Sequence, residues 1–195
     1  MQTKSSLLVL YFTLVATVLC VLTCSAQASI NLNVPMKTQT FQSTFKYPSA
    51  QAAYQVLKTT EVMFSLQPYV YYVQIISQTD TSRELDFAEK IPVFFGVFNY
   101  DTGKLRAVQA FDNSQRSIVS NVPFPGGLGT LVANLSFTES ADVDENGLKT
   151  ITCNEIVNGQ VFLLAKLFVE DSVKSAHTQL VADIANYFTT HPASA

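Results

Sequence analysis

The sequence has few residues of the kinds that hold metals or cross-link chains. It contains 3 Cys and 2 His among 195 residues, and Cys20 and Cys24 lie in an apolar leader. If the leader is removed, Cys153 alone remains, which excludes an intramolecular disulfide. One cysteine with His177 and His191 does not assemble a zinc site, so we expect no metal and no cofactor.

Basic residues are also few. The chain has 12 Lys and Arg against 15 Asp and Glu, and loss of Lys4 with the leader brings the net charge near -4. This acidity offers no phosphate-binding patch, so we expect no nucleic-acid partner. The glycine cluster 126–129 is not followed by Lys-Ser or Lys-Thr, and we interpret it as a turn rather than a phosphate loop.

The leader itself predicts secretion. Lys4 precedes an apolar run over 7–22, and Ala26 and Ala28 have the A-x-A spacing of a signal-peptidase site. We therefore expect a signal peptide at 1–28, an extracellular protein that starts at Ser29, and no stable membrane span after cleavage. The alternatives are a retained N-terminal membrane anchor and a lipoprotein attached through Cys24.

Residues 29–195 are long enough for one domain with a core of its own. The chain's 14 Phe and 8 Tyr, all but Phe12 and Tyr11 of the leader, supply apolar area for it. Strand-like alternation over 36–45 precedes a helix from Ala50 to Thr59 that Ser49 caps, and 62–66 is a short turn or second helix. A terminal amphipathic helix starts at Asp171 or Ser172, and 160–169 either ends a strand or leads into that helix. The further predicted strands are 69–77, 84–90, 93–100, 105–111, 117–122, 130–138 and 148–157.

Three segments resemble the START-like, polyketide-cyclase-like helix-grip superfamily. The first segment is 47–57, which begins Tyr-Pro-Ser-Ala. The second is 64–70, which reads Phe-Ser-Leu-Gln-Pro-Tyr-Val, and the third is the terminal stretch 164–188. The resemblance implies an α+β helix-grip fold, in which a curved antiparallel sheet of about seven strands wraps around the long C-terminal helix and a short helix pair follows the first strand. Tyr54 stands near the place where that superfamily often has Trp.

The resemblance also implies binding of a hydrophobic small molecule or lipid, with catalysis in some members. Alternation places Cys153 and Glu155 on the inward face of 148–157, where Cys153 acts as a small apolar residue and Glu155 needs a polar partner or an open end of the fold. We interpret His177 as a solvated helix residue. The candidate ligand-binding residues are Phe64, Phe95, Val97, Gln109, Phe111, Ile151, Cys153, Glu155, Leu180 and Ile184.

Two details of the strands can be checked. The turn at 101–103 joins the predicted strands 93–100 and 105–111 and allows two registers. A three-residue loop with Gly103 in the left-handed conformation places Phe95 and Val97 on the same face as Gln109 and Phe111. A two-residue loop places Phe94 and Phe98 there instead. The sequon that starts at Asn134 is a glycosylation candidate on the outward face of 130–138.

The sequence thus predicts a secreted binding protein with an internal cavity. A first alternative is a cyclase- or dehydratase-like enzyme, which needs two or more polar side chains converging in the cavity. A second is a secreted interaction protein whose interior is filled by its own Phe and Tyr side chains.

Overall fold

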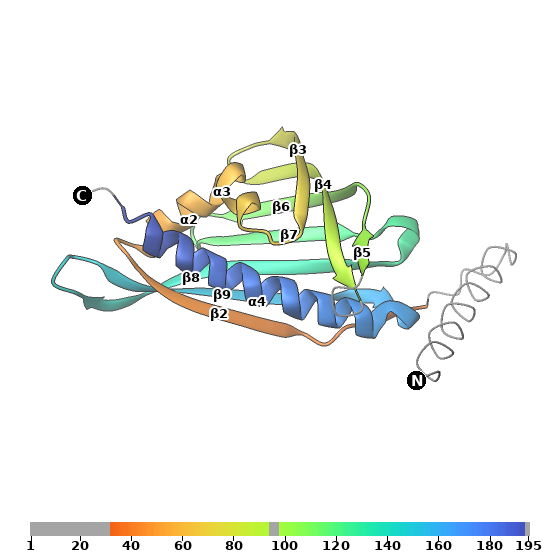
Figure 1. Ribbon diagram of the computed structural model, residues 1–195. Helices are drawn as coiled ribbons and strands as arrows, with labels where there is room; N and C mark the ends of the chain where they lie inside the picture. Colours follow the sequence, from red (N-terminus) through yellow and green to blue (C-terminus); the bar gives the residue numbers. More distant parts are fainter. Residues whose placement is uncertain (1–31, 94–97, 194–195) are drawn as a thin grey trace, which may run out of the picture. The chain divides into compact units, whose positions relative to one another are not determined.

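The computed structural model describes residues 32–93 and 98–193. In these residues one nine-stranded antiparallel sheet curves around a long C-terminal helix (Figure 1). The strand order is β1-β9-β8-β7-β6-β4-β3, β2 also pairs with β9, and β5 also pairs with β4. The helix-grip architecture is confirmed, and of the nine strands the short Asn33–Pro35 has no counterpart among those predicted.

The elements follow the chain in the predicted order. The strands are β1 Asn33–Pro35, β2 Gln39–Tyr47, β3 Val70–Gln78, β4 Ser82–Val93, β5 Phe98–Asp101, β6 Leu105–Asp112, β7 Ser117–Pro123, β8 Gly129–Val143 and β9 Lys149–Phe162. The helices are α2 Ala50–Lys58, α3 Thr60–Ser65 and α4 Lys166–Thr190, and η1 Pro125–Gly127 and η2 Leu163–Ala165 are single 3₁₀ turns. The glycine cluster lies in the turn between β7 and β8, as predicted. Within 32–93 and 98–193, no helix is both long and apolar enough to cross a bilayer.

Helix α2 is fixed to the sheet at both ends. At its start, Ser49 Oγ accepts a hydrogen bond from Ala52 N at 3.1 Å, as the sequence predicted, and the Glu139 carboxylate of β8 accepts one from Ala50 N at 2.7 Å. At its end, the carbonyl oxygen of Lys58 accepts from Arg83 Nη1 of β4 at 3.1 Å. An acid at the N-terminus and a base at the C-terminus both match the helix dipole.

Helix α4 begins earlier than the sequence predicted. It starts at Lys166 without a side-chain cap, so Asp171 and Ser172 lie within it and the capping prediction was wrong. The ambiguous segment 160–169 divides, because Gln160–Phe162 completes β9 and η2 then turns the chain directly into the helix. The geometry of this turn sets the helix start, and local capping preference does not. The apolar face is confirmed, since Val173, Leu180, Val181, Ile184 and Phe188 are buried.

The middle of the sheet corrects one predicted pairing. Strand β5 does not form a hairpin with β6; it pairs with the end of β4, where Val93 lies opposite Phe98, while β6 pairs with the beginning of β4, where Phe87 lies opposite Leu105. At 12 residues, β4 is long enough to take both partners in succession. Gly103 has the predicted positive φ of 63°. The turn that contains it connects β5 to β6, and both of these strands pair with β4 rather than with each other.

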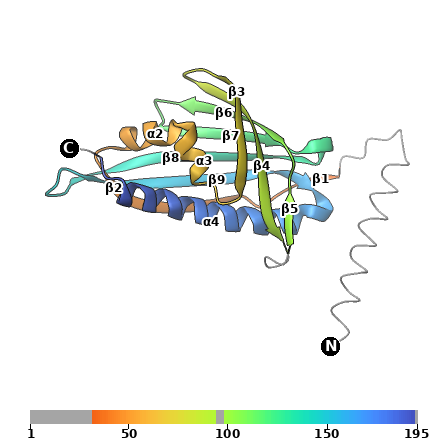
Figure 2. The same cartoon turned by 45° about the horizontal axis from the view of Figure 1, so that its top comes forward.

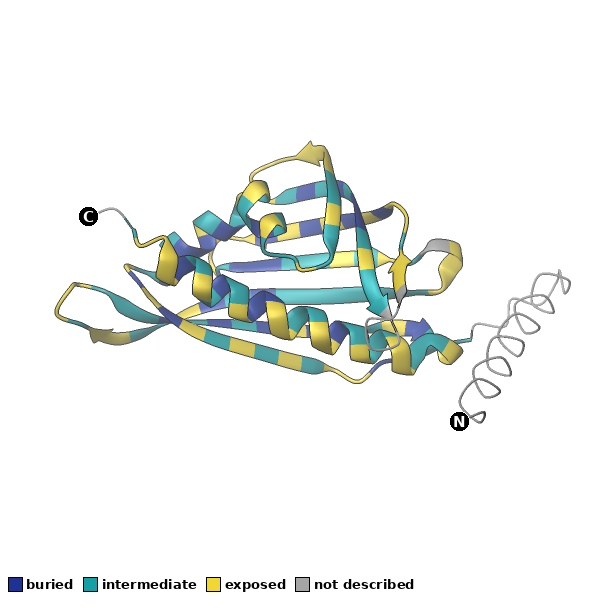
Figure 3. Cartoon of the chain, in the orientation of Figure 1, coloured by how far each residue is buried: buried dark blue, intermediate teal, exposed yellow. Residues whose placement is uncertain are grey.

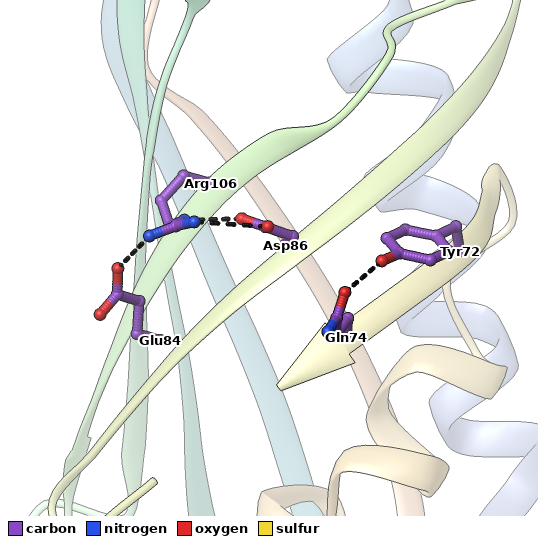
Figure 4. A network of polar contacts seen from close by, with 5 residues as sticks. All are labelled: Tyr72, Gln74, Glu84, Asp86 and Arg106. Carbon is purple, nitrogen blue, oxygen red and sulfur yellow. Dashed lines mark hydrogen bonds and ion pairs between the residues drawn. The ribbon is translucent and has the colours of Figure 1, made fainter. Parts of the chain in front are cut away.

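All three helices α2, α3 and α4 lie on the same face of the sheet (Figure 2). We call this the inner face. The opposite, outer face carries a polar network of half-buried and exposed side chains: Arg106 contacts Asp86 at 2.6 Å and Glu84 at 2.7 Å, and Tyr72 donates to Gln74 on β3 (Figure 4). The inner face therefore holds the core and any internal site.

The buried apolar residues of the described chain form three separate clusters. The largest joins α2 and the C-terminal half of α4 to β2, β8 and β9, and it includes Tyr54, Phe137 and Phe188. A second joins the beginning of α4 to β9 around Val157 and Val161. The third lies on β4 and β6 around Leu85, Phe87, Leu105 and Ala107. Half-buried Phe41 packs against the first and second clusters and half-buried Phe64 against the first and third, so the clusters are joined through partly covered side chains.

Candidate functional site

Besides Ser43 on β2, whose buried hydroxyl has no hydrogen-bond partner among the described residues, the polar side chains taken out of water on the inner face form two groups. The first, which we call the Arg83 cluster, consists of Arg83, Gln109, Ser120 and Thr60. The second, which we call the Glu155–His177 pair, joins β9 to α4. In both groups polar atoms have been taken out of water, which costs free energy unless hydrogen bonds replace it.

The Arg83 cluster is closed on itself. Arg83 is 1% exposed, and its Nε and Nη2 donate to Gln109 Oε1 at 2.9 and 2.6 Å. Its Nη1 donates to the Lys58 carbonyl and to Thr60 Oγ1, and Gln109 Nε2 in turn donates to Ser120 Oγ at 2.9 Å. Burial lowers the pKa of Arg83 to about 10, against a smaller opposing effect of Glu61. The cluster therefore holds the helix pair against β4 and β6.

The Glu155–His177 pair is not closed in this way. Glu155 is 3% exposed, and its Oε2 lies 2.9 Å from His177 Nδ1, whose side chain is 14% exposed. The two atoms are close but are not aligned for a hydrogen bond, and neither has another partner among the described residues. Both atoms therefore keep unused hydrogen-bonding capacity.

The sequence located one member of this pair correctly. Glu155 points inward and meets a polar partner inside the fold, as predicted. The interpretation of His177 as a solvated residue was wrong, because the curvature of β2 and β9 around α4 covers the flank of the helix next to its apolar stripe. The ring of Phe41 on β2 stacks on His177, with ring centroids 5.6 Å apart.

A second carboxylate lies near this pair. Glu89 on β4 is half-buried, and burial raises its pKa above the ordinary value, while His177 is close enough for its positive charge to oppose that rise. Ionisable side chains from β4, β9 and α4 therefore approach one another on the inner face. Among the described residues, no group of three or more His, Cys, Asp and Glu has the geometry of a metal site.

The inner face is only partly covered along the central strands, at the margins of the two smaller apolar clusters. Ser120, Val122, Leu131 and Ala133 lie on the central strands β7 and β8 and face the helices, yet all four are only half-buried. By contrast, Ile118, Leu135 and Phe137, further along the same strands toward α2, are buried (Figure 3). The interior is tightly packed at the α2 end and less so beside the Glu155–His177 pair.

The candidate ligand-binding residues divide between these regions. Glu155 lies in the less packed part, Gln109 belongs to the Arg83 cluster, and the ring of half-buried Phe64 lies 5.7 Å from the Arg83 guanidinium. Phe95 and Val97 lie outside the described residues, as do Phe94 and the side chain of Phe98. The remaining candidates are all in the largest apolar cluster: Phe111, Ile151, Cys153, Leu180 and Ile184.

Cys153 is a buried apolar residue, as predicted. It is a free cysteine, and burial, followed by the charge of Glu155, raises the pKa of its thiol. A nucleophilic cysteine needs the opposite shift. Asn134 lies on the outer face, as predicted, but it is half-buried between Val119 of β7 and Ile156 of β9.

Sequence reasoning missed His177, Glu89 and Phe41 as neighbours of Glu155. Phe41 could have been found, because alternation along the first strand places it on the inward face together with Phe45. His177 follows the inward Ala176 directly and precedes Leu180 by three positions, so its helical position was available as a signal. Alternation with the apolar Leu85 and Phe87 could have placed Glu89 on the inward face of its strand, but its approach to His177 depends on how the sheet curves around α4.

No family model matches the chain, and no curated protein matches it. Solved structures do. The aromatase/cyclase Zhui from Streptomyces sp. R1128 superposes with a TM-score of 0.57 at 9% identity, over 80% of this chain and 96% of that one. The chain therefore has the helix-grip fold that this aromatase/cyclase also has.

A second similar structure is norcoclaurine synthase from Thalictrum flavum. It matches with a TM-score of 0.56 at 13% identity over 86% of this chain and 95% of that one. A structure of that enzyme with dopamine and hydroxybenzaldehyde matches with a TM-score of 0.54 at 14% identity, over 87% and 96%. At these identities the likeness establishes the helix-grip fold, and chemistry has to be argued from the residues of this chain.

Proposed function

We propose that this helix-grip chain binds a hydrophobic or amphipathic small molecule, such as a lipid, between α4 and the inner face of the sheet. The observation that carries the proposal is the buried Glu155–His177 pair, whose facing atoms have no hydrogen-bond partner among the described residues, on the same face as half-buried apolar side chains of β8. An interior filled by its own Phe and Tyr side chains would cover Leu131 and Ala133, which are only half-buried. An apolar surface with a few polar groups is typical of small-molecule sites.

Mass spectrometry of the protein purified under native conditions tests this proposal. We expect a co-purifying lipid or other apolar molecule, and a rise in melting temperature when the emptied protein is titrated with members of a lipid panel. Absence of both would favour the filled-core interaction protein.

A pair of matched variants locates the site. Ala133→Phe places a large ring on the half-buried part of the inner face, and we expect it to abolish ligand binding while the protein still folds. Ala110→Phe makes the same change on the exposed outer face of β6 and should leave binding unaltered. Equal binding by both variants would place the ligand elsewhere.

The alternative is an enzyme of the cyclase kind, favoured by the approach of Glu155 to His177. A carboxylate beside an imidazole is an arrangement that orients a general base. In that case the co-purified molecule should be converted to a product of different mass or retention time during incubation, and His177→Gln should stop the conversion without releasing the molecule. A ligand that stays unchanged in the wild-type protein supports binding alone.

We also propose that the protein is secreted after removal of 1–28, a segment outside the described residues. N-terminal sequencing of the protein from its natural source should begin at Ser29. A sequence that begins at Met1 would instead support a membrane-tethered binding domain. In a eukaryotic source, a shift in gel mobility after glycosidase treatment would reveal a glycan on Asn134.

A further inference from the structure

The carboxylates beside α4 specify what kind of polar group a ligand should carry. We propose that the internal site takes an apolar molecule whose polar end is a hydrogen-bond donor, and preferably a cation such as a primary amine, held by Glu155 together with Glu89. This inference rests on the proposed small-molecule function and adds the chemical class of the ligand.

The first argument is the balance of hydrogen-bond donors and acceptors. Carboxylates accept hydrogen bonds when ionised, and each oxygen has room for more than one. Among the described residues, Glu155 Oε2 has no hydrogen-bond partner, and no hydrogen bond to the Glu89 carboxylate is found either. The described donors on this part of the face are His177, which is not aligned with Oε2, and the hydroxyl of Ser43 on the adjacent strand β2. Together they offer fewer hydrogen bonds than two carboxylates accept. The site therefore has acceptors in excess, which a donating group would satisfy.

The second argument is charge. His177 supplies at most one positive charge to two carboxylates, so a further cation improves the balance. Arg83 cannot supply it, because it stands six residues before Glu89 on β4, about 20 Å along an extended strand. The hydrogen bonds of Arg83 also hold its guanidinium at the Lys58 carbonyl, Thr60 and Gln109.

The third argument is the apolar surroundings. Phe41 stacks on His177, and the half-buried Leu131 and Ala133 lie on the same face as Glu155, on the neighbouring strand β8. A charge-assisted hydrogen bond is stronger in such surroundings than in water, whereas a carboxylate ligand would place like charges together. A donor head group would thus lie against the carboxylates, and an apolar body would lie against Leu131, Ala133 and Phe41.

Two sets of matched probes test the inference. Within each set the apolar part is kept nearly the same and the polar end is an amine, an alcohol or a carboxylate. Decylamine, decanol and decanoate are titrated into the wild-type protein by calorimetry at pH 7.5, below their micelle concentrations, and the set is repeated with 2-phenylethylamine, 2-phenylethanol and 3-phenylpropionate. We expect the amine to bind at least tenfold more tightly than the carboxylate, with the alcohol between them.

Variants connect this order to the named carboxylates. Glu155→Gln should weaken amine binding roughly tenfold and alcohol binding by less than threefold, and Glu89→Gln should act in the same direction with a smaller effect. Glu84→Gln, on the same strand as Glu89 but on the outer face (Figure 4), should change neither.

The outcomes separate the two proposals. If the carboxylate or the alcohol binds as tightly as the amine, or if Glu155→Gln leaves amine binding unchanged, the head-group inference is wrong and the small-molecule function stands. If none of the six probes binds and the lipid panel also gives no thermal shift, both proposals fail. The order of affinities in the wild-type protein decides the question even if a variant does not fold.

Discussion

The Arg83 cluster and the Glu155–His177 pair are both buried and polar on the same face of one sheet, yet they differ in how well their atoms are satisfied. Arg83 donates to Gln109, Thr60 and the Lys58 carbonyl, and Gln109 passes a further hydrogen bond to Ser120. Glu155 Oε2 and His177 Nδ1 approach to 2.9 Å without a hydrogen bond to any described residue. Burial of an unsatisfied polar atom costs free energy that a satisfied network does not.

This difference assigns the two groups different roles. A closed network stabilises one arrangement of the scaffold, and the Arg83 cluster lies where the helix pair meets β4. An open pair destabilises the unliganded fold and is typical of sites where something else binds. The packing agrees, because apolar residues around α2 are buried whereas those on β7 and β8 near Ala133 are half-exposed.

The largest expected effect concerns the closed cluster. Arg83→Met removes the donor from three acceptors inside the fold, and we expect the free energy of unfolding to fall by about 3 kcal/mol in urea denaturation. Arg106→Met is the matched control on the outer face, where the side chain is 49% exposed, and it should leave stability almost unchanged. Equal effects of the two substitutions would contradict the structural role of the Arg83 cluster.

The open pair should respond in the opposite sense. Replacing Glu155 and His177 together by Leu removes two desolvated groups that do not satisfy each other, so the free energy of unfolding should rise by about 1 kcal/mol or more, while ligand binding is lost. Urea denaturation of the ligand-free protein and calorimetry measure the two effects. A loss of stability in the double variant would show that the pair contributes to the scaffold.

The smallest expected effect is a pH dependence at Glu89. Burial raises the pKa of Glu89 in the folded state, with His177 opposing, so the folded protein binds this proton more tightly than the unfolded chain. Its contribution to stability is present below the ordinary value of 4.5 and is lost as the pH rises through the folded pKa. Relative to wild type, Glu89→Gln should gain stability as the pH is raised from 4 to 7.5.

A control of opposite sign is available for that measurement. A hydrogen bond from Lys149, followed by one from Ala50 N, lowers the pKa of Glu139, so its contribution is present above the ordinary value and is lost as the pH falls. Glu139→Gln should therefore lose stability relative to wild type as the pH rises. The same sign for both variants would overturn the assignment of Glu89 to a desolvated position.

The fold followed from local signals that tertiary contacts reinforce. Ser49 predicted the start of α2 because it offers a hydroxyl before an apolar helical pattern, and the alternation of Cys153 and Glu155 predicted the inward face of β9 because side-chain direction has a period of two. The spacing of Val173, Leu180 and Ile184 predicted the face by which α4 contacts the sheet.

Features that depend on distant parts of the chain were not predicted. The pairing of β5 with β4 was missed because Asp101 and Gly103 form a good turn whichever strand follows. His177 was misread because its burial depends on how far β2 and β9 curve around α4. The approach of Glu155, Glu89 and His177 combines three elements that are separated by many residues in the sequence, which no local pattern encodes.

The attachment of α2 at both ends also bears on how a ligand reaches the interior. Glu139 holds the first turn of this helix and Arg83 holds the last, so displacement of α2 along its axis would break charged contacts at either end. Exchange of a bound molecule should therefore proceed on the opposite side, beside the beginning of α4. Its rate should be insensitive to a cross-link between α2 and the sheet and sensitive to one between α4 and β4.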